Sequence, residues 1–141
     1  MRIMAIDYGD ARTGVAISDP TGLLAGFTTV INAYRPDRVT EQIALLAKEH
    51  RVERLVLGHP INMDGTRGPR SEKAQAMRQL LEETTGLPVV LWDERRTTID
   101  AHQILMSSGK NAKKRKKVVD AVAASLILEG YLTYLKTHPE G

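Results

Sequence analysis

The sequence predicts an α/β fold: a mixed five-stranded sheet, with three antiparallel strands followed by parallel strands, flanked by helices. Two observations predict it. Strand-like runs separated by glycine and proline fill the first third of the chain, and helical periodicity then alternates with short apolar runs. No linker or internal repeat divides the 141 residues, so we expect one domain over 1–141.

The opening third is expected to form an antiparallel meander. Gly9 and Gly14 separate the first apolar run from the second, as the turn residues of a hairpin do. Pro20 and Gly22 then turn the chain into a third run. The predicted strands cover 2–8, 15–19 and about 24–31.

From Pro36 the pattern changes to helices alternating with buried strands. Val39, Ile43 and Ala47 recur at helical spacing, and the short apolar run that follows predicts a strand reached by a crossover helix. A loop at 59–70, rich in glycine and proline, is longer than most strand-to-helix connections. We expect further strands at 54–58 and 89–92, and helices over 36–50, from Ser71 to Gly86, from Thr97 or Thr98 to Gly109, and over 118–135.

Charge and composition restrict the chemistry. The net charge is +3, and subtracting the six positive charges at 110–117 leaves −3 elsewhere, so the basic run predicts contact with a polyanion at one place. The chain has no cysteine, which excludes thiol nucleophiles and thiolate metal sites. It also has no apolar run of the ~20 residues that a membrane span needs and no secretory signal pattern, so we expect a cytoplasmic protein.

Three acidic residues at element ends are candidate metal ligands. Asp7 ends the first strand on the face of Ile3 and Ala5, although an aspartate there also suits a turn. Glu94 or its neighbour Asp93 ends the last strand, and alternation lets only one of them face a pocket.

The third acidic candidate, Asp120, shares a helical stripe with Ala123, Ala124 and Ile127. An acid in a first helical turn is also favoured by the helix dipole, which is the alternative explanation of its position. Converging carboxylates without cysteine or a histidine pair favour Mg²⁺ or Mn²⁺, and such a site suits phosphodiester hydrolysis.

Basic residues are candidates for holding a phosphate backbone. Arg12, between two glycines, offers a donor fork. The lysine-rich run precedes Asp120 and would steer substrate, although such runs are commonly solvated connections between helices. With one Phe and one Trp, the chain is not expected to carry an aromatic stacking platform. The run contributes Lys113, Lys114, Arg115 and Lys116.

Four ordered blocks resemble the signatures of the YqgF family. They are DYGDARTGVAISD at 7–19, GHPINMDGTRGPRSE at 58–72, WDERRTT at 92–98 and KKVVDAVAASLIL at 116–128. The family is similar to RuvC-type Holliday junction resolvases of the ribonuclease H-like fold. The resemblance implies a nuclease acting on a junction or on the 5′ end of the small-subunit ribosomal RNA precursor.

The same resemblance implies roles for individual residues. Asp7, Glu94 and Asp120 match the acidic triad. His59 stands where a leucine is usual and Arg96 where an apolar residue is usual, and both departures concern loop packing. Residues that match substrate-side blocks or adjoin the triad are Arg12, Asn62, Asp64, Gly65, Arg70 and Arg95.

The leading hypothesis is therefore a Mg²⁺- or Mn²⁺-dependent nuclease acting on an RNA precursor or on branched DNA, as a monomer or homodimer, with the ribosome as a further candidate partner. One alternative is a non-catalytic nucleic-acid or ribosome-associated module. Another is an actin-like ATPase, because DYGDARTG also resembles a phosphate loop of that fold. Length argues against the ATPase, because those folds enclose a nucleotide between two lobes and 141 residues provide one.

Overall fold

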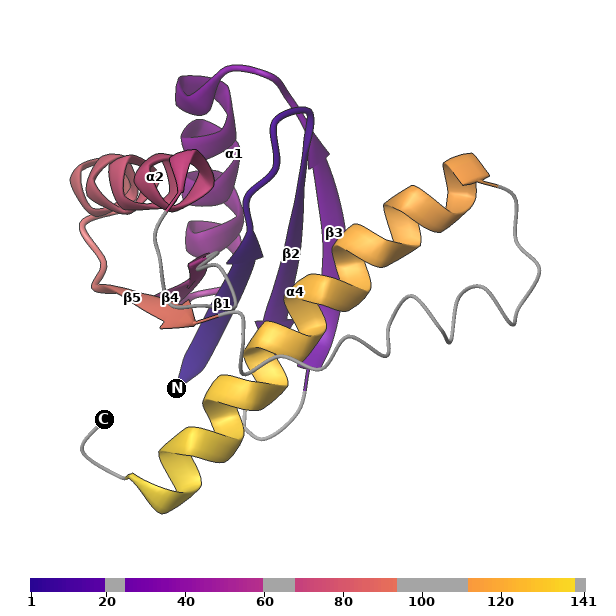
Figure 1. Cartoon of the computed structure of the whole chain (residues 1–141). Helices are drawn as coiled ribbons and strands as arrows, with labels where there is room; N and C mark the ends of the chain where they lie inside the picture. The colour runs from indigo at the N-terminus through magenta and orange to yellow at the C-terminus, as the bar shows by residue number, and fades with distance from the viewer. Residues whose placement is uncertain (20–24, 60–67, 94–111, 139–141) are drawn as a thin grey trace.

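A computed structural model of the chain describes residues 1–19, 25–59, 68–93 and 112–138 (Figure 1). Its centre is a five-stranded sheet in the order β3-β2-β1-β4-β5. β1 pairs antiparallel with β2, which pairs antiparallel with β3, whereas β1, β4 and β5 run parallel. The predicted mixed sheet is confirmed. The strands are β1 (Arg2–Asp7), β2 (Arg12–Ser18), β3 (Ala25–Asn32), β4 (Val52–His59) and β5 (Val89–Asp93).

Helices cover both faces of this sheet (Figure 1). α1 (Pro36–Glu49) and α2 (Pro69–Thr85) pack on one face, and α4 (Ala112–Thr137) lies diagonally across the other. Near its C-terminal end, α4 is tied to the start of β4 by a hydrogen bond of 2.8 Å that Arg54 Nη1 donates to the hydroxyl of Tyr131. No helix of the described residues is long and apolar enough to cross a membrane.

Alternation along β1 divides the core into two clusters. Met4 and Ile6 belong to the cluster under α1 and α2, and Ile3 and Ala5 belong to the cluster under α4. All four side chains are buried, because β1 lies between β2 and β4 and is covered on both faces. The side chain of Asp7, the next odd-numbered residue, therefore emerges on the α4 face.

The hairpin turn predicted for residues 9–14 is wrong in its second half. β2 begins at Arg12 rather than at residue 15, and Gly14 is a strand residue whose partner in β1 is Asp7. The physical reason is pairing with the third strand, since Arg12 and Thr13 are opposite Asn32 and Ile31 of β3. At Arg12 and Thr13, local turn propensity is overridden by the ladder with β3.

Two helices begin earlier than predicted. α2 begins at Pro69 instead of Ser71, because proline suits a first helical turn and Gly68 supplies an extended N-cap. α4 begins at Ala112 instead of 118, so the basic run at 113–117 belongs to the helix and not to a connection before it. Lysine and arginine are good helix formers and allow the helix to extend through the run. The helix predicted from Thr97 or Thr98 to Gly109 lies outside the described residues.

A pair of leucine variants tests how far the α4 layer stabilises the fold. Leu128 of α4 is fully buried against the sheet, whereas Leu45 of α1 is 67% exposed. Leu128→Ala is expected to lower the free energy of unfolding by about 2–5 kcal/mol, because it leaves a cavity. Leu45→Ala is expected to change it by less than about 0.5 kcal/mol. Urea denaturation measures both, and equal effects would contradict the packing described for α4.

Candidate active site

Asp7 is the last residue of β1 and lies half-buried at the carboxyl edge of the parallel strands. Its partner on β2 is Gly14. On the other side, Ile6 is level with Leu57, which brings Asp7 beside Gly58 of β4 one residue further on. Both neighbours of this carboxylate in its row of the sheet are therefore glycines. A glycine within a strand often marks a place where a ligand approaches the sheet closely.

Arg12 begins β2 on the same face as Asp7. It lies two residues before Gly14, and side chains two apart on a strand share a face. A diagonal pair of this kind has Cα atoms about 7–8 Å apart, within reach of an arginine side chain. A carboxylate and a guanidinium thus stand at one edge of the sheet, facing the α4 layer.

Asp93 and Asp7 lie on opposite faces of the sheet. In β5, Val90 and Trp92 pack against the α4 cluster, whereas Val89 and Leu91 pack on the α1 and α2 side. Asp93 follows Leu91 by two residues and so shares the α1 and α2 face. The competition between Asp93 and Glu94 for a place beside Asp7, left open by the sequence, thus turns against Asp93.

Asp120 lies in the third turn of α4, eight residues after the helix begins at Ala112. An acid that far along a helix is beyond the first turn, so the helix-dipole explanation of this residue is wrong. Its helical position is in line with Ala124 and Ile127, four and seven residues later, and both are buried against the sheet. The side chain of Asp120 itself lies outside what the structure describes.

Most of the other predicted contacts lie wholly or partly outside the described residues. Arg70 is in the first turn of α2, and Lys113, Lys114, Arg115 and Lys116 are in the first turns of α4, where the structure describes the backbone but not these side chains. Among the described side chains, no group of three acidic or histidine residues could hold a metal ion. Glu94, Asn62, Asp64, Gly65 and Arg95 are outside the description altogether.

The donor set at this edge nevertheless fits a hard cation. Asp7 offers carboxylate oxygens, the ligand type that Mg²⁺ and Mn²⁺ prefer. The glycines at 14 and 58 add no side chain beside it in its row of the sheet. Asp7 is therefore a candidate ligand for an ion on the α4 face.

His59 is buried and contacts α2, so its position suits a role in packing. It ends β4 on the α1 and α2 side, is 6% exposed, and its Nε2 lies 2.6 Å from the hydroxyl oxygen of Ser71 in α2. This contact joins the end of β4 to the first turns of α2. The buried histidine ring is thereby accommodated through a polar partner.

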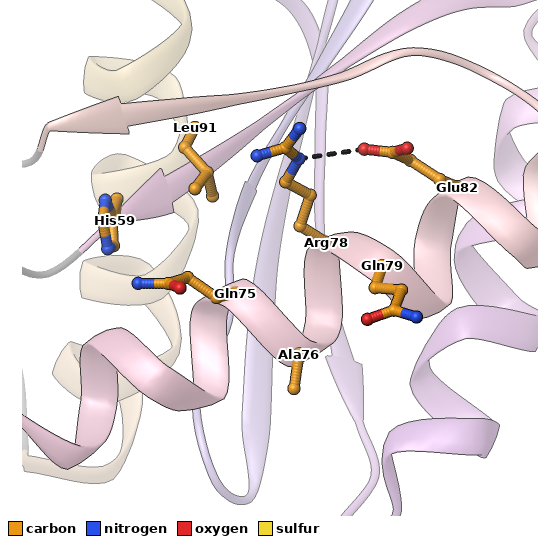
Figure 2. A pocket seen from close by; sticks show the side chains of 7 residues that line it. All are labelled: His59, Gln75, Ala76, Arg78, Gln79, Glu82 and Leu91. Carbon is orange, nitrogen blue, oxygen red and sulfur yellow. Dashed lines mark hydrogen bonds and ion pairs between the residues drawn. The ribbon is translucent and has the colours of Figure 1, made fainter.

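Two cavities flank α2 on the face opposite to Asp7, and sequence reasoning found neither. The larger, about 710 Å³, lies between α2 and β5, and Figure 2 shows His59 and Leu91 at one end of it and the ion pair of Arg78 with Glu82, 2.9 Å apart, at the other. The smaller, about 340 Å³, is lined partly by Tyr8 and Tyr34. Only its two tyrosines could have indicated the smaller cavity from the sequence, because its lining comes from segments far apart in the chain.

The arrangement of strands and helices matches solved structures of RuvC and of a viral resolvase. A structure titled "T. thermophilus RuvC in complex with Holliday junction substrate" superposes with a TM-score of 0.61 over 95% of this chain and 96% of that one, at 16% identity. A second, "Crystal structure of Fowlpox virus resolvase and substrate Holliday junction DNA complex", gives 0.51 over 98% and 99%, at 11% identity. The fold is therefore of the ribonuclease H-like class to which RuvC belongs.

Sequence comparison defines the family within that class. Residues 1–134 match the family described as "RuvX: Holliday junction resolvase", and the chain belongs to this family. It is 46% identical over 134 residues to a protein of Halothermothrix orenii, covering 95% of this chain and 96% of that one, and 44% identical over 137 residues to one of Bacillus subtilis, covering 96% and 99%. Both relatives are named "Putative pre-16S rRNA nuclease". The family resemblance of the four motifs is confirmed.

Two buried hydroxyl groups, one that contacts His59 and one without a partner in the described residues, are expected to differ in their effect on stability when removed. Ser71→Ala removes a partner of a buried ring nitrogen and is expected to lower the free energy of unfolding by about 1–3 kcal/mol. The hydroxyl of Thr13 is also buried but has no hydrogen-bond partner within the described residues, so Thr13→Val is expected to be neutral or stabilising. Chemical denaturation compares the two. A larger loss for Thr13→Val would contradict this assignment.

Proposed function

We propose that this protein is a divalent-metal nuclease that hydrolyses phosphodiester bonds in structured nucleic acid. The observation that carries the proposal is the placement of Asp7, a half-buried carboxylate at the carboxyl edge of the sheet with a glycine on each side. That row faces the helix that carries Asp120. Membership of a family whose relatives are named nucleases supports the same chemistry.

Asp7, Glu94 and Asp120 are the residues that would hold the metal. Glu94 is favoured over Asp93 because Asp93 follows the opposite face of β5. When bound, one or two Mg²⁺ or Mn²⁺ ions activate water and stabilise the leaving oxygen in phosphodiester hydrolysis. The chain thus supplies carboxylate ligands, and no separate strong base is required of it.

Arg12 and the N-terminal turns of α4 hold the substrate backbone in this proposal. Arg12 shares the face of Asp7 and presents several N–H donors to a phosphate next to the scissile one. The basic residues at 113–116 lie on the same helix as Asp120, one to two turns before it. They attract phosphates toward the carboxylates, with an affinity that falls as salt rises.

The substrate we propose is the precursor of the small-subunit ribosomal RNA, cut in the cytoplasm near its 5′ end. The names of the bacterial relatives favour it. A four-way DNA junction is the second candidate, favoured by the family description. Paired cuts in a junction would require a two-fold dimer.

Substitution of the acids tests the proposal directly. Asp7→Asn, Glu94→Gln and Asp120→Asn are each expected to lower cleavage of an extended ribosomal RNA precursor by at least 100-fold, because each removes a negatively charged metal ligand. Asp93→Asn is the matched control and is expected to stay within about threefold of the unmodified protein. Cleavage is measured with Mg²⁺ or Mn²⁺, and EDTA should abolish it.

Retention of normal cleavage by all three acid variants would contradict the proposal, and so would unchanged activity in EDTA. A four-way junction assayed in parallel distinguishes the substrates. If neither nucleic acid is cut but both are bound, and binding survives loss of the acids, the protein is a binding module. Thermal stabilisation by ATP without cleavage would favour the actin-like alternative.

The basic run makes a separate prediction about salt. Replacing Lys113, Lys114, Arg115 and Lys116 with glutamine is expected to reduce the slope of log affinity against log salt by up to about 3, because four phosphate contacts are lost. Cleavage at saturating substrate should be largely retained. Lys48→Gln combined with Lys136→Gln, at exposed positions at the ends of α1 and α4, provides the control. An unchanged slope would show that these four residues do not contact the phosphates of the nucleic acid.

A further inference from the structure

The smaller cavity beside α2 lies at the reverse side of the strand end that carries Asp7. Tyr8 follows Asp7 directly and lines the cavity, so the two side chains leave opposite faces of one strand end. Tyr34 and Pro36, before and at the start of α1, form another part of the wall. We call this site the tyrosine cavity; Lys73, Met77 and Leu80 of α2 complete the part of its lining used below.

The tyrosine cavity combines an aromatic wall with an apolar base. Tyr34 is 82% exposed, an unusual state for so large an apolar ring. Tyr8 is half-buried and packs against the cluster under α1 and α2, which fixes its position. Met77 is buried at the base. The expectation that the chain lacks a stacking platform rested on Phe and Trp, whereas the aromatic groups gathered here are tyrosines.

Among the described residues that line the cavity, Lys73 is the cation. Lys73 Nζ lies 3.1 Å from the carboxylate of Asp10, and the two side chains are 59% and 85% exposed. Ion pairs as exposed as this contribute little to stability. A phosphate oxygen therefore competes with Asp10 for Lys73 at small cost.

The hydroxyl of Tyr8 adds a polar group to this wall. A phenol hydroxyl donates a hydrogen bond to a carbonyl or ring nitrogen of a bound group. The site thus offers a donor, two ring faces and a cation.

The geometry points to a binding site for one unpaired nucleotide of the nucleic-acid substrate, with its base against Tyr34 and its phosphate near Lys73. This inference rests on the proposed nuclease function. A volume of about 340 Å³ is at the small end of ligand sites, and a base held in a duplex would not enter it. The substrate strand would pass over the end of β1. The bond to be cut would lie near Asp7 on the α4 face of the sheet, and a neighbouring base would lie in the tyrosine cavity on the α1 and α2 face.

Binding measurements without catalysis test the inference. Fluorescence anisotropy of a labelled single-stranded oligonucleotide, and of a blunt duplex of equal length, is recorded in EDTA so that no strand is cut. Tyr34→Ala is expected to raise the Kd for the single strand by about 5- to 150-fold, because stacking of one base contributes about 1–3 kcal/mol. Tyr34→Phe should stay within about twofold, and the duplex should respond to neither.

Leu45→Ala is the matched control, since Leu45 is another large exposed side chain on the same side of the sheet and is absent from the cavity lining. Its Kd should not change. Photo-crosslinking with a 5-iodouridine oligonucleotide gives a second measurement, and the modified peptide is expected to contain Tyr34 or Tyr8. Thermal melting of each variant confirms that it is folded.

An equal Kd for Tyr34→Ala and the unmodified protein would overturn the inference, as would crosslinks confined to other segments or an equal loss of duplex binding. These outcomes are independent of the proposed function. A protein that cuts the precursor through Asp7 but binds single strands normally without Tyr34 would retain the nuclease assignment and lose the nucleotide site. A protein that never cuts would lose the nuclease assignment.

Discussion

The central position of β1 constrains what each side of this molecule can do. The strand is paired on both edges and covered on both faces, so its side chains alternate between two buried clusters until the strand ends. Asp7 and Tyr8 are the first residues to leave that enclosure, and alternation sends them to opposite faces. The carboxylate faces α4 and the phenol faces α2. The two binding functions that we propose thus involve consecutive residues.

A glycine lies on each side of Asp7 in its row of the sheet. A strand normally gains stability from side-chain pairs across its neighbours, and Gly14 and Gly58 forgo those contacts on either side of Asp7. The local loss is offset by the apolar clusters on both faces, in which residues such as Met4 and Val56 are fully buried. A larger residue at either glycine position would add a side chain next to the carboxylate. The row in which we propose the chemistry thus lacks the cross-strand side-chain pairs that Asp7 would otherwise make.

Much of the fold could be predicted from the sequence because its periodicities are local. The five strands and the helices α1, α2 and α4 all appear in the predicted order. The start of β2 was misplaced because Arg12 and Thr13 look like turn residues until their pairing with β3 is known. The start of α4 was misplaced because a charge run is compatible with a solvated connection, and only the structure shows it to be helical.

The candidate site was harder to predict because its selection depends on tertiary contacts. The sequence of residues 92–94 alone does not show which side chain shares the face of Asp7. Packing of Trp92 against α4 and of Leu91 on the other side decides it against Asp93. The tyrosine cavity could not have been foreseen for a similar reason. Its walls come from the end of β1, the start of α1 and the middle of α2, which only the fold brings together.

The most direct test of the account is the location of a divalent ion in crystals soaked with Mn²⁺, which an anomalous difference map identifies without reference to any assay. The account predicts a peak on the α4 face of the sheet, within coordination distance of an Asp7 carboxylate oxygen and of Asp120, and its loss in Asp7→Asn. Well-diffracting crystals with no peak beside Asp7, or with ions bound only elsewhere, would contradict it.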